Sequence, residues 1–220
     1  MKNTIIFDNK IDFKQGETLA FFLNENFDFR AESRIFSAQT LNKIQVYLKN
    51  LKLKKIKEKI IGFDISEKNK VLFIVVKKNL VSSNFEELGA NFYSFIKMNK
   101  IDKINLYADT IKSFKLYKKN TGLILRFIHG FSLKSYSFNK YKTQNKNIFY
   151  FLLKVLSSEK TSLNNNYFKY KAIESGVFQA RDLVSEPPNI LYPKKYVEII
   201  KKLSSLGIKM FGGSETKSLA

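Results

Sequence analysis

The single histidine, His129, is the first side chain to consider for catalysis or metal binding. The chain offers no second histidine to share a metal and no cysteine that a histidine could activate. His129 also lies within an apolar helical pattern, between Ile128 and Gly130. We therefore expect it to have a structural or surface role.

The charged residues near expected element ends are weak candidates as well. Arg181 and Asp182 fall on an expected helix just before a proline break, where packing or interdomain contacts are the more usual role. Asp8, Asp64 and Asp102 each stand at or near an expected strand end, where carboxylates can bind metal. No paired spacing supports a metal site, so we expect these carboxylates to be solvated. No residue of this chain is predicted to be catalytic, cofactor-binding or metal-binding.

Two further features have structural explanations. The sequence Gly212-Gly213-Ser214 is too short for a phosphate-binding loop and lacks the G-x-x-x-x-G-K-[ST] frame. Several aromatic residues follow strand or helix periods, which predicts core positions rather than stacking platforms. They are Phe21, Phe22, Phe92, Tyr93, Phe149 and Tyr150.

The formal net charge of +20 raises the question of nucleic-acid binding. Of the 39 basic residues all but Arg30, Arg34, Arg126 and Arg181 are lysine, whereas arginine makes most bidentate contacts to phosphate and guanine. A lysine-rich solvated surface is therefore favoured, with at most weak, non-specific nucleic-acid binding. The densest basic run, residues 49–59, is where a specific site would be expected.

Composition predicts a folded chain. Hydrophobic residues make up 44% of the sequence, which is enough to fill a core. No apolar stretch reaches the ~18 residues that a membrane span requires, and the N-terminus lacks an apolar signal segment. We expect a soluble, cytoplasmic protein with no membrane partner.

Short apolar runs alternate with helical patterns along the first 155 residues. The expected strands are residues 4–7, 18–23, 60–65, 71–76, 104–108 and 147–155. The expected helices are residues 39–48, 85–96 (with Ser83 or Asn84 as its cap) and 122–136. This alternation predicts an α/β domain with a mixed sheet flanked by helices.

The region after residue 164 has a different organisation. Asn164, Asn165 and Asn166 can cap a helix that runs to Ser185, in which Ile173, Val177, Ala180 and Val184 repeat at helical spacing. Gly176 within that helix costs about 1 kcal/mol relative to alanine unless close packing compensates.

All three prolines follow this helix. Pro187 and Pro188 end it, Pro193 suits the first turn of a second helix, and Gly207 is its expected stop before a strand at residues 208–211. This order predicts a linker that enters a second α/β domain.

Two segments carry a family resemblance. Residues 174–193 (ESGVFQARDLVSEPPNILYP) resemble the "ARDLVNEPPN" domain junction of leucyl aminopeptidases, and residues 135–143 (SYSFNKYKT) resemble that family's "YRFDKYKT" segment. The resemblance implies a macro-like N-terminal domain at residues 1–160, and a linking helix with the proline junction at 161–192. It also implies the start of a truncated catalytic domain at 193–220.

The same resemblance implies a chemistry that this chain does not itself carry. Leucyl aminopeptidases release N-terminal amino acids from peptides with two divalent metal ions, manganese or zinc, which clamp the reacting oxygens. Their metal ligands sit in "GKGxTFDSGG" and "NTDAEGRL" motifs, and neither string occurs here. We expect the chain to be inactive alone, and to act on peptides only if a catalytic domain is supplied. The family is hexameric through its catalytic domains, so we expect this chain to be monomeric.

Two alternatives remain open from the sequence. One is a stand-alone basic module that binds nucleic acid. The other is a small-ligand cleft at the carboxyl ends of the strands, since macro-type domains elsewhere bind ADP-ribose. The cleft ranks last because no glycine-rich phosphate loop stands in the right place.

Overall fold

The computed structural model describes residues 3–10, 16–29, 35–54, 58–67, 69–77, 81–113, 121–141, 149–203, 207 and 209. It divides into two compact units, Met1–Ser175 and Gly176–Ala220. The division falls within one long helix. The three-part division expected from the sequence stays a prediction.

The first unit is built around a six-stranded sheet in the order β1-β6-β5-β2-β4-β3. The strands are β1 (Thr4–Asp8), β2 (Thr18–Asn24), β3 (Ile60–Asp64), β4 (Lys70–Val76), β5 (Lys103–Tyr107) and β6 (Leu152–Leu156). All neighbours are parallel except β3, which pairs antiparallel with β4 at the edge. The expectation of an α/β fold with a mixed sheet is confirmed.

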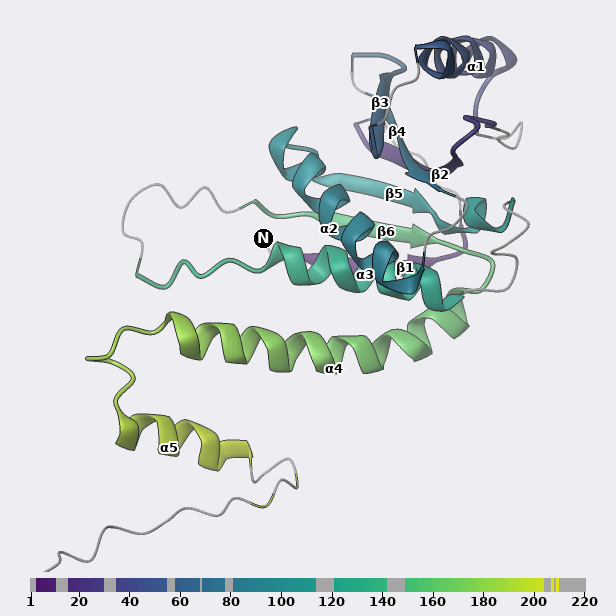
Figure 1. The fold of residues 1–220 in the computed structure, drawn as a ribbon. Helices are drawn as coiled ribbons and strands as arrows, with labels where there is room; N and C mark the ends of the chain where they lie inside the picture. Colours follow the sequence, from purple (N-terminus) through teal and green to yellow (C-terminus); the bar gives the residue numbers. More distant parts are fainter. Residues whose placement is uncertain are drawn as a thin grey trace, which may run out of the picture. The chain divides into compact units, whose positions relative to one another are not determined.

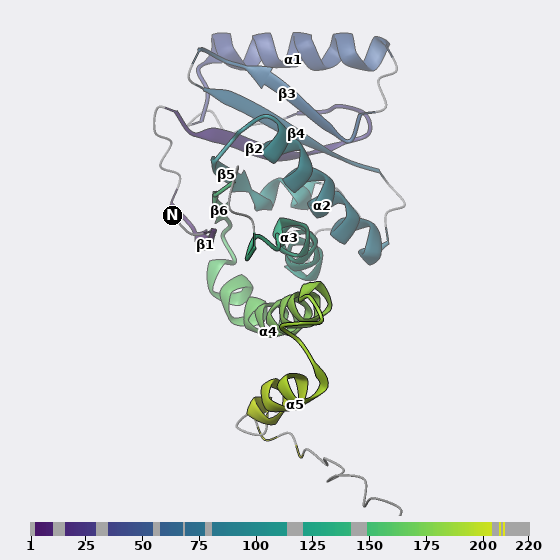
Figure 2. The ribbon, with the colours of Figure 1, turned by 90° about the vertical axis from the view of Figure 1, so that its left-hand side faces the viewer.

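One face of the sheet is covered by α1 (Ala38–Leu53). Ser37 caps this helix by accepting a hydrogen bond from the backbone N–H of Thr40. The core on this face joins apolar residues of α1 to alternate residues of β2 and β4 (Figures 1 and 2). It includes Leu19, Phe21, Leu23, Ile44, Leu48, Leu51, Val71 and Phe73.

The other face is covered by α2 (Ser82–Met98) and α3 (Thr121–Ser135). Ala20 and Phe22, which alternate along β2 with the residues that face α1, pack into this larger core. Side chains of a strand point alternately to the two faces of the sheet. The two helices approach each other closely at Gly89 and Gly130. An ion pair between Arg126 and Glu86, 3.0 Å long, also joins them.

The helix α4 (Lys160–Ser185) begins four residues before the expected asparagine cap. Asn164–Asn166 lie within the helix, where the Asn166 side chain donates to the carbonyl of Ser162 instead of capping. Its buried positions also differ from the apolar repeat in the sequence. Leu163 and Glu174 are buried, whereas Ile173 and Val184 are exposed.

The second unit contains the end of α4 and the helix α5 (Pro193–Lys201). Pro193 occupies the first turn of α5 as expected, because its missing N–H would have no partner there. Helix α5 ends at Lys201 with Lys202 as its C-cap, so Gly207, which has a φ of 81°, is not the helix stop expected from the sequence. The strand expected at residues 208–211 lies outside the described residues, apart from Lys209, which is not in a strand.

Two further expectations need correction. The cap of α2 is Val81, not Ser83 or Asn84, although the Asn84 side chain accepts the Val81 N–H at 3.0 Å. Strand β6 begins at Leu152 rather than at residue 147, since Phe149 and Tyr150 have no strand pairing and residues 147 and 148 are outside the described range. The chain between β5 and α3 also contains a 3₁₀ helix, η1 (Ala108–Ser113).

Candidate functional site

A buried polar cluster joins α3 to the first part of α4. The Glu174 side chain accepts hydrogen bonds from His129 Nδ1 at 3.1 Å, from Ser132 Oγ at 2.8 Å and from the Tyr167 hydroxyl at 3.1 Å. His129, Ser132 and Glu174 are each less than 9% exposed. A buried carboxylate is tolerated only when hydrogen bonds replace its lost water, and this one has three donors.

The contacts around this cluster are those of packed helices and indicate a structural role rather than a catalytic one. The Tyr170 ring packs on His129 with centroids 5.1 Å apart, and Leu163 is fully buried one turn before Tyr167. Residues 163, 167, 170 and 174 therefore lie along one side of α4, where Tyr170 and Glu174 contact α3 and the Tyr167 ring contacts Phe7 of β1. The structural role expected for His129 agrees with this position.

The environment of Tyr167 disfavours its ionisation. Burial, followed by the charge of Glu174 and the hydrogen bond to it, raises the pKa of the Tyr167 hydroxyl well above its ordinary value. A phenolate there would lose its water and face a carboxylate. The folded state therefore retains this proton in alkaline solution longer than the unfolded chain does.

Replacement of Tyr167 by phenylalanine tests this linkage. Above pH ~10 the unfolded chain releases the tyrosine proton and the folded chain keeps it, so the free energy of unfolding should fall by up to about 1.4 kcal/mol per pH unit from this group. The Tyr167→Phe variant should be about 1 kcal/mol less stable at pH 7, through one lost hydrogen bond, and should lose stability less steeply above pH 10. Urea unfolding between pH 7 and 11 measures both effects. Equal slopes for the two proteins would contradict the assignment.

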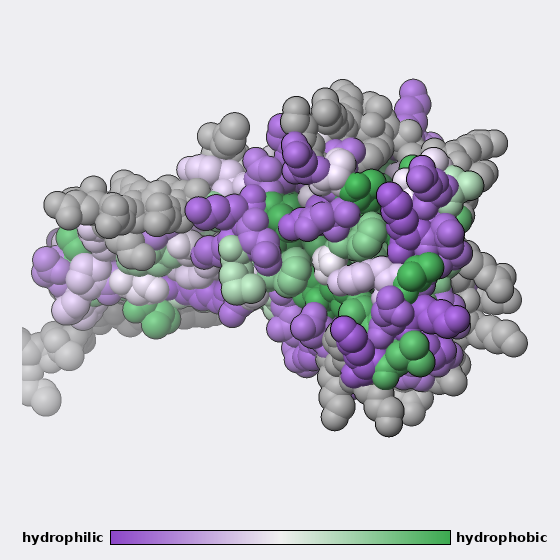
Figure 3. Space-filling view, turned by 90° about the horizontal axis from the view of Figure 1, so that it is seen from above, coloured by the Kyte–Doolittle hydropathy of each residue, from purple (hydrophilic) through white to green (hydrophobic). Residues whose placement is uncertain are grey.

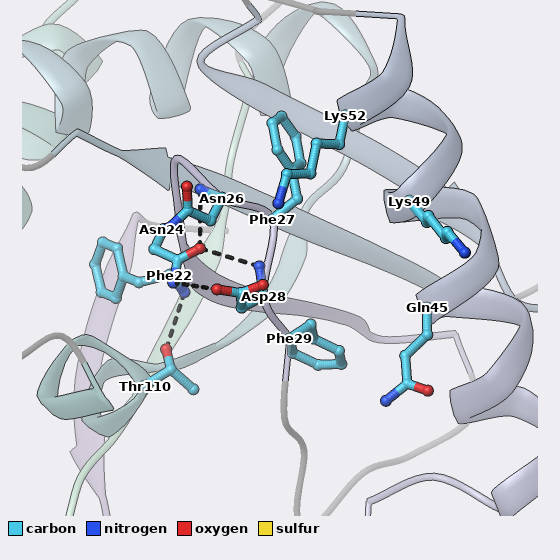
Figure 4. A pocket seen from close by; sticks show the side chains of 10 residues that line it. All are labelled: Phe22, Asn24, Asn26, Phe27, Asp28, Phe29, Gln45, Lys49, Lys52 and Thr110. Carbon is cyan, nitrogen blue, oxygen red and sulfur yellow. Dashed lines mark hydrogen bonds between the residues drawn. The ribbon is translucent and has the colours of Figure 1, made fainter.

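A hollow of about 740 Å³ lies at the carboxyl end of β2 (Figure 4). One wall is the loop that follows β2, and the other is α1, from which Gln45, Lys49 and Lys52 extend. The full lining is Phe22, Asn24, Asn26, Phe27, Asp28, Phe29, Gln45, Lys49, Lys52 and Thr110.

The floor of this hollow is fixed by η1. The Thr110 hydroxyl accepts the N–H of Phe22 at 2.9 Å and donates to the carbonyl of Tyr107 at 2.6 Å. Asp109 holds the other side of η1 by accepting hydrogen bonds from Ser157 and from the backbone N–H of Ser158. Burial acts to raise the pKa of Asp109, but these hydrogen bonds outweigh it and lower the pKa.

The structure does not bring the three candidate carboxylates together. Asp8 ends β1 and accepts hydrogen bonds from the N–H groups of Asn9 and Lys10, which lower its pKa. Asp64 and Asp102 line a second hollow of about 500 Å³ at the amino ends of β2, β4 and β5, and Asp64 pairs there with Lys70 at 3.3 Å. Within the described ranges, no group of three or more His, Cys, Asp or Glu side chains could hold a metal ion.

The other candidate residues have varied positions. Arg181 and Asp182 lie on α4 in the second unit, both exposed. Phe21, Phe22, Phe92 and Tyr93 are buried, which confirms their expected core role. Phe149 is partly buried against the same core as Tyr93, and Gly212-Gly213-Ser214 lies outside the described residues.

The described lysines of the basic run at residues 49–59 lie in several different surroundings. Lys49 and Lys52 line the hollow, Lys54 is the C-cap of α1, Lys59 pairs with Glu87, and residues 55–57 are outside the described ranges. Hydrophilic residues cover much of the face shown in Figure 3, with hydrophobic residues in small separate groups between them. In the part of the chain that the structure describes, no helix has the length and apolar character to cross a membrane.

Comparison with curated proteins gives a consistent answer. A probable cytosol aminopeptidase of Phytoplasma australiense is 31% identical over 117 residues, which is 53% of this chain and 23% of that protein. The corresponding protein of Methylorubrum populi is 36% identical over 86 residues, 38% of this chain and 17% of that protein. A third, from Phytoplasma mali, is 27% identical over 192 residues, covering 70% of this chain and 37% of that protein.

The chain is related to the leucyl (cytosol) aminopeptidases. It spans well under half the length of these relatives, and this partial coverage fits the N-terminal region of the family. No family model matches the chain.

Two solved structures share their fold with this chain. A mutant of tomato leucine aminopeptidase superposes with a TM-score of 0.69 at 18% identity, over 93% of this chain and 42% of that one. The bottromycin maturation enzyme BotP superposes with a TM-score of 0.57 at 15% identity, over 88% of this chain and 38% of that one. At these identities the likeness concerns the fold alone.

The sequence carries no local signal for the groups that form the polar cluster or the first hollow. Glu174 stands out only as part of the junction motif, and Ser132 and Tyr167 are ordinary helical residues without a chemical signature. Lys49 and Lys52 belong to the densest basic run, but their place beside the loop after β2 depends on the fold.

Proposed function

We propose that this chain is the N-terminal, non-catalytic part of a metal-dependent leucyl aminopeptidase. The observation that carries the proposal is the superposition on tomato leucine aminopeptidase, which takes in 93% of this chain but only 42% of the enzyme. The sequence relation to cytosol aminopeptidases supports it independently. The complete protein would release amino acids from peptide N-termini in the cytoplasm.

The proposal assigns three parts to the chain. Residues 1–160 form the macro-like domain, residues 161–192 form the linking helix and proline junction, and residues 193–220 begin the catalytic domain. The exposure of Val184 (88%) and the half-exposure of Ile190, Tyr192 and Tyr196 are consistent with a further domain that packs on this region.

The manganese or zinc ions of such an enzyme do not fit the residues described here. No cluster of metal ligands is present among them, and the family's two metal motifs do not occur in the sequence. Metal binding, peptide cleavage and hexamer formation are therefore assigned to the catalytic domain, and the chain alone is expected to be monomeric. For nucleic-acid binding, no contact or geometry of the described residues gives specific support.

Peptidase assays on the purified 220-residue chain test this proposal. With leucine p-nitroanilide and either Mn²⁺ or Zn²⁺, we expect no hydrolysis above the rate of metal alone. Sedimentation should give a monomer under the same conditions. The coding DNA after Ala220, read in all three frames, should contain the "NTDAEGRL" motif. Metal-dependent hydrolysis by the chain alone would overturn the proposal.

A further inference from the structure

Gly176 is a glycine inside a helix without a packing reason for its presence. It lies within α4, and no atom is within 4 Å of the position that its Cβ would take. At Gly89 and Gly130, by contrast, a Cβ would lie 1.9 Å from a backbone oxygen of the facing helix. Glycine in a helix interior costs about 1 kcal/mol relative to alanine, and at Gly176 no close contact offsets that cost.

The backbone conformation of Gly176 does not require glycine either. Its φ is not positive, unlike those of Gly16 and Gly207, and it lies inside a continuous α-helix. Other residues adopt this conformation, and alanine does so at a lower cost. The property that remains is the wide conformational freedom of glycine, which allows a helix to bend.

The packing that holds α4 ends just before this glycine. Glu174 is 5% exposed and accepts hydrogen bonds from two side chains of α3. None of residues 175–203 is buried. The two compact units of the chain also divide between Ser175 and Gly176. The glycine therefore stands where a helix that is held on one side becomes a helix that is exposed to solvent.

We propose that Gly176 is a hinge at which α4 bends while its first part stays fixed on α3. Sharp bends in helices have few causes, and adjacent serine and glycine residues, such as Ser175 and Gly176, are one of them. Hinges are a few positions, often small residues, that absorb the backbone change. In an aminopeptidase of the proposed kind, this hinge would let the chain after the linking helix turn without disturbing the macro-like domain.

Distances between two spin labels on α4 test the hinge in the intact chain. The chain has no cysteine, so Asn165→Cys and Val184→Cys place single labels at exposed positions on either side of Gly176. In a straight helix their Cα atoms would be roughly 29 Å apart. Pulsed electron paramagnetic resonance should give this pair a distance distribution about twice as wide as that of Thr161→Cys with Ser175→Cys, which lies before the hinge. Gly176→Ala should narrow the first distribution to the width of the second.

Two controls separate a hinge from fraying of the helix end. Gln179→Ala changes an exposed residue of the same helix and should leave the wide distribution as it is. The Cα chemical shifts of residues 177–184 should stay helical, because a hinge bends a helix without unfolding the turns that follow. A narrow distribution in the parent chain, equal widths with and without Gly176→Ala, or non-helical shifts after residue 177 would each overturn the proposal. The proposed function can stand if the hinge fails, because these measurements report on α4 alone.

Discussion

Replacement of Gly89 by alanine is expected to destabilise the first unit by about 3 kcal/mol or more, the upper end of what overpacking costs. A Cβ on Gly89 would lie 1.9 Å from the carbonyl oxygen of Phe127 and 2.9 Å from the N atom of Phe131. Both are backbone atoms of α3, so no side chain can turn aside. The helices α2 and α3 would have to separate, which would disturb the large core they share with the sheet. Urea unfolding monitored by circular dichroism measures the loss.

The same contact can be tested from the opposite helix and against a matched control. A Cβ on Gly130 would lie 1.9 Å from the carbonyl oxygen of Glu86, so Gly130→Ala should have a similar effect. Gly176 in α4 has no atom within 4 Å of its Cβ position, and Gly176→Ala should raise stability by about 1 kcal/mol through helix propensity. If all three variants unfolded at the same urea concentration, the close approach of α2 and α3 would be wrong.

These glycines also mark the limit of reasoning from the sequence. The sequence alone raises the possibility of close packing at Gly176, yet its surroundings are open. Gly89 and Gly130 are the ones at which two backbones meet. A glycine inside a helical pattern indicates a position where close packing leaves no room for a side chain. The neighbouring residues in the sequence do not show which helix packs there.

The strands and helices themselves were largely predictable. The apolar runs that became β2 and β4 are buried on both faces, and continuous hydrophobicity is typical of interior parallel strands. Helices α1 and α3 follow from apolar spacings of three and four residues. The order of the strands did not follow, because β5 lies beside β2 and not beside β4, which precedes it in the chain. The hollow between β2 and α1 depends on that order, so its residues could not be grouped from the sequence.

Glu174 illustrates a different limit. Patterns of apolar residues assign a glutamate to the solvent side of a helix, and Ile173 beside it to the buried side. The structure reverses both, with Glu174 5% and Ile173 54% exposed. The reason is non-local, since the partners His129 and Ser132 lie 45 and 42 residues earlier in the chain.

Replacement of Glu174 by alanine should release the first part of α4 from α3. Its removal leaves His129 Nδ1, Ser132 Oγ and the Tyr167 hydroxyl buried without their acceptor. Each orphaned group costs about 1–3 kcal/mol, and partial access of water should reduce the sum to about 3 kcal/mol. Glu174 and Leu163 are the buried residues of α4, so the loss of Glu174 removes much of what holds this helix in place. The loss of stability should therefore be largest in α4. Hydrogen exchange should become faster at amides of residues 163–174, while amides of β2 and β4 remain protected.

Two variants make this result specific to the buried carboxylate. Glu174→Gln keeps the shape and one acceptor oxygen, so it should retain part of the stability that Glu174→Ala loses. Glu87→Ala removes a helical glutamate that is 59% exposed and paired with Lys59, and should change stability little. A Glu174→Ala and Ser132→Ala double variant should be less destabilised than the sum of the two single variants, because Ser132 has already lost its acceptor in the first. Strict additivity would show that the two side chains are not coupled, and that α4 is held by Leu163 and the tyrosine rings alone.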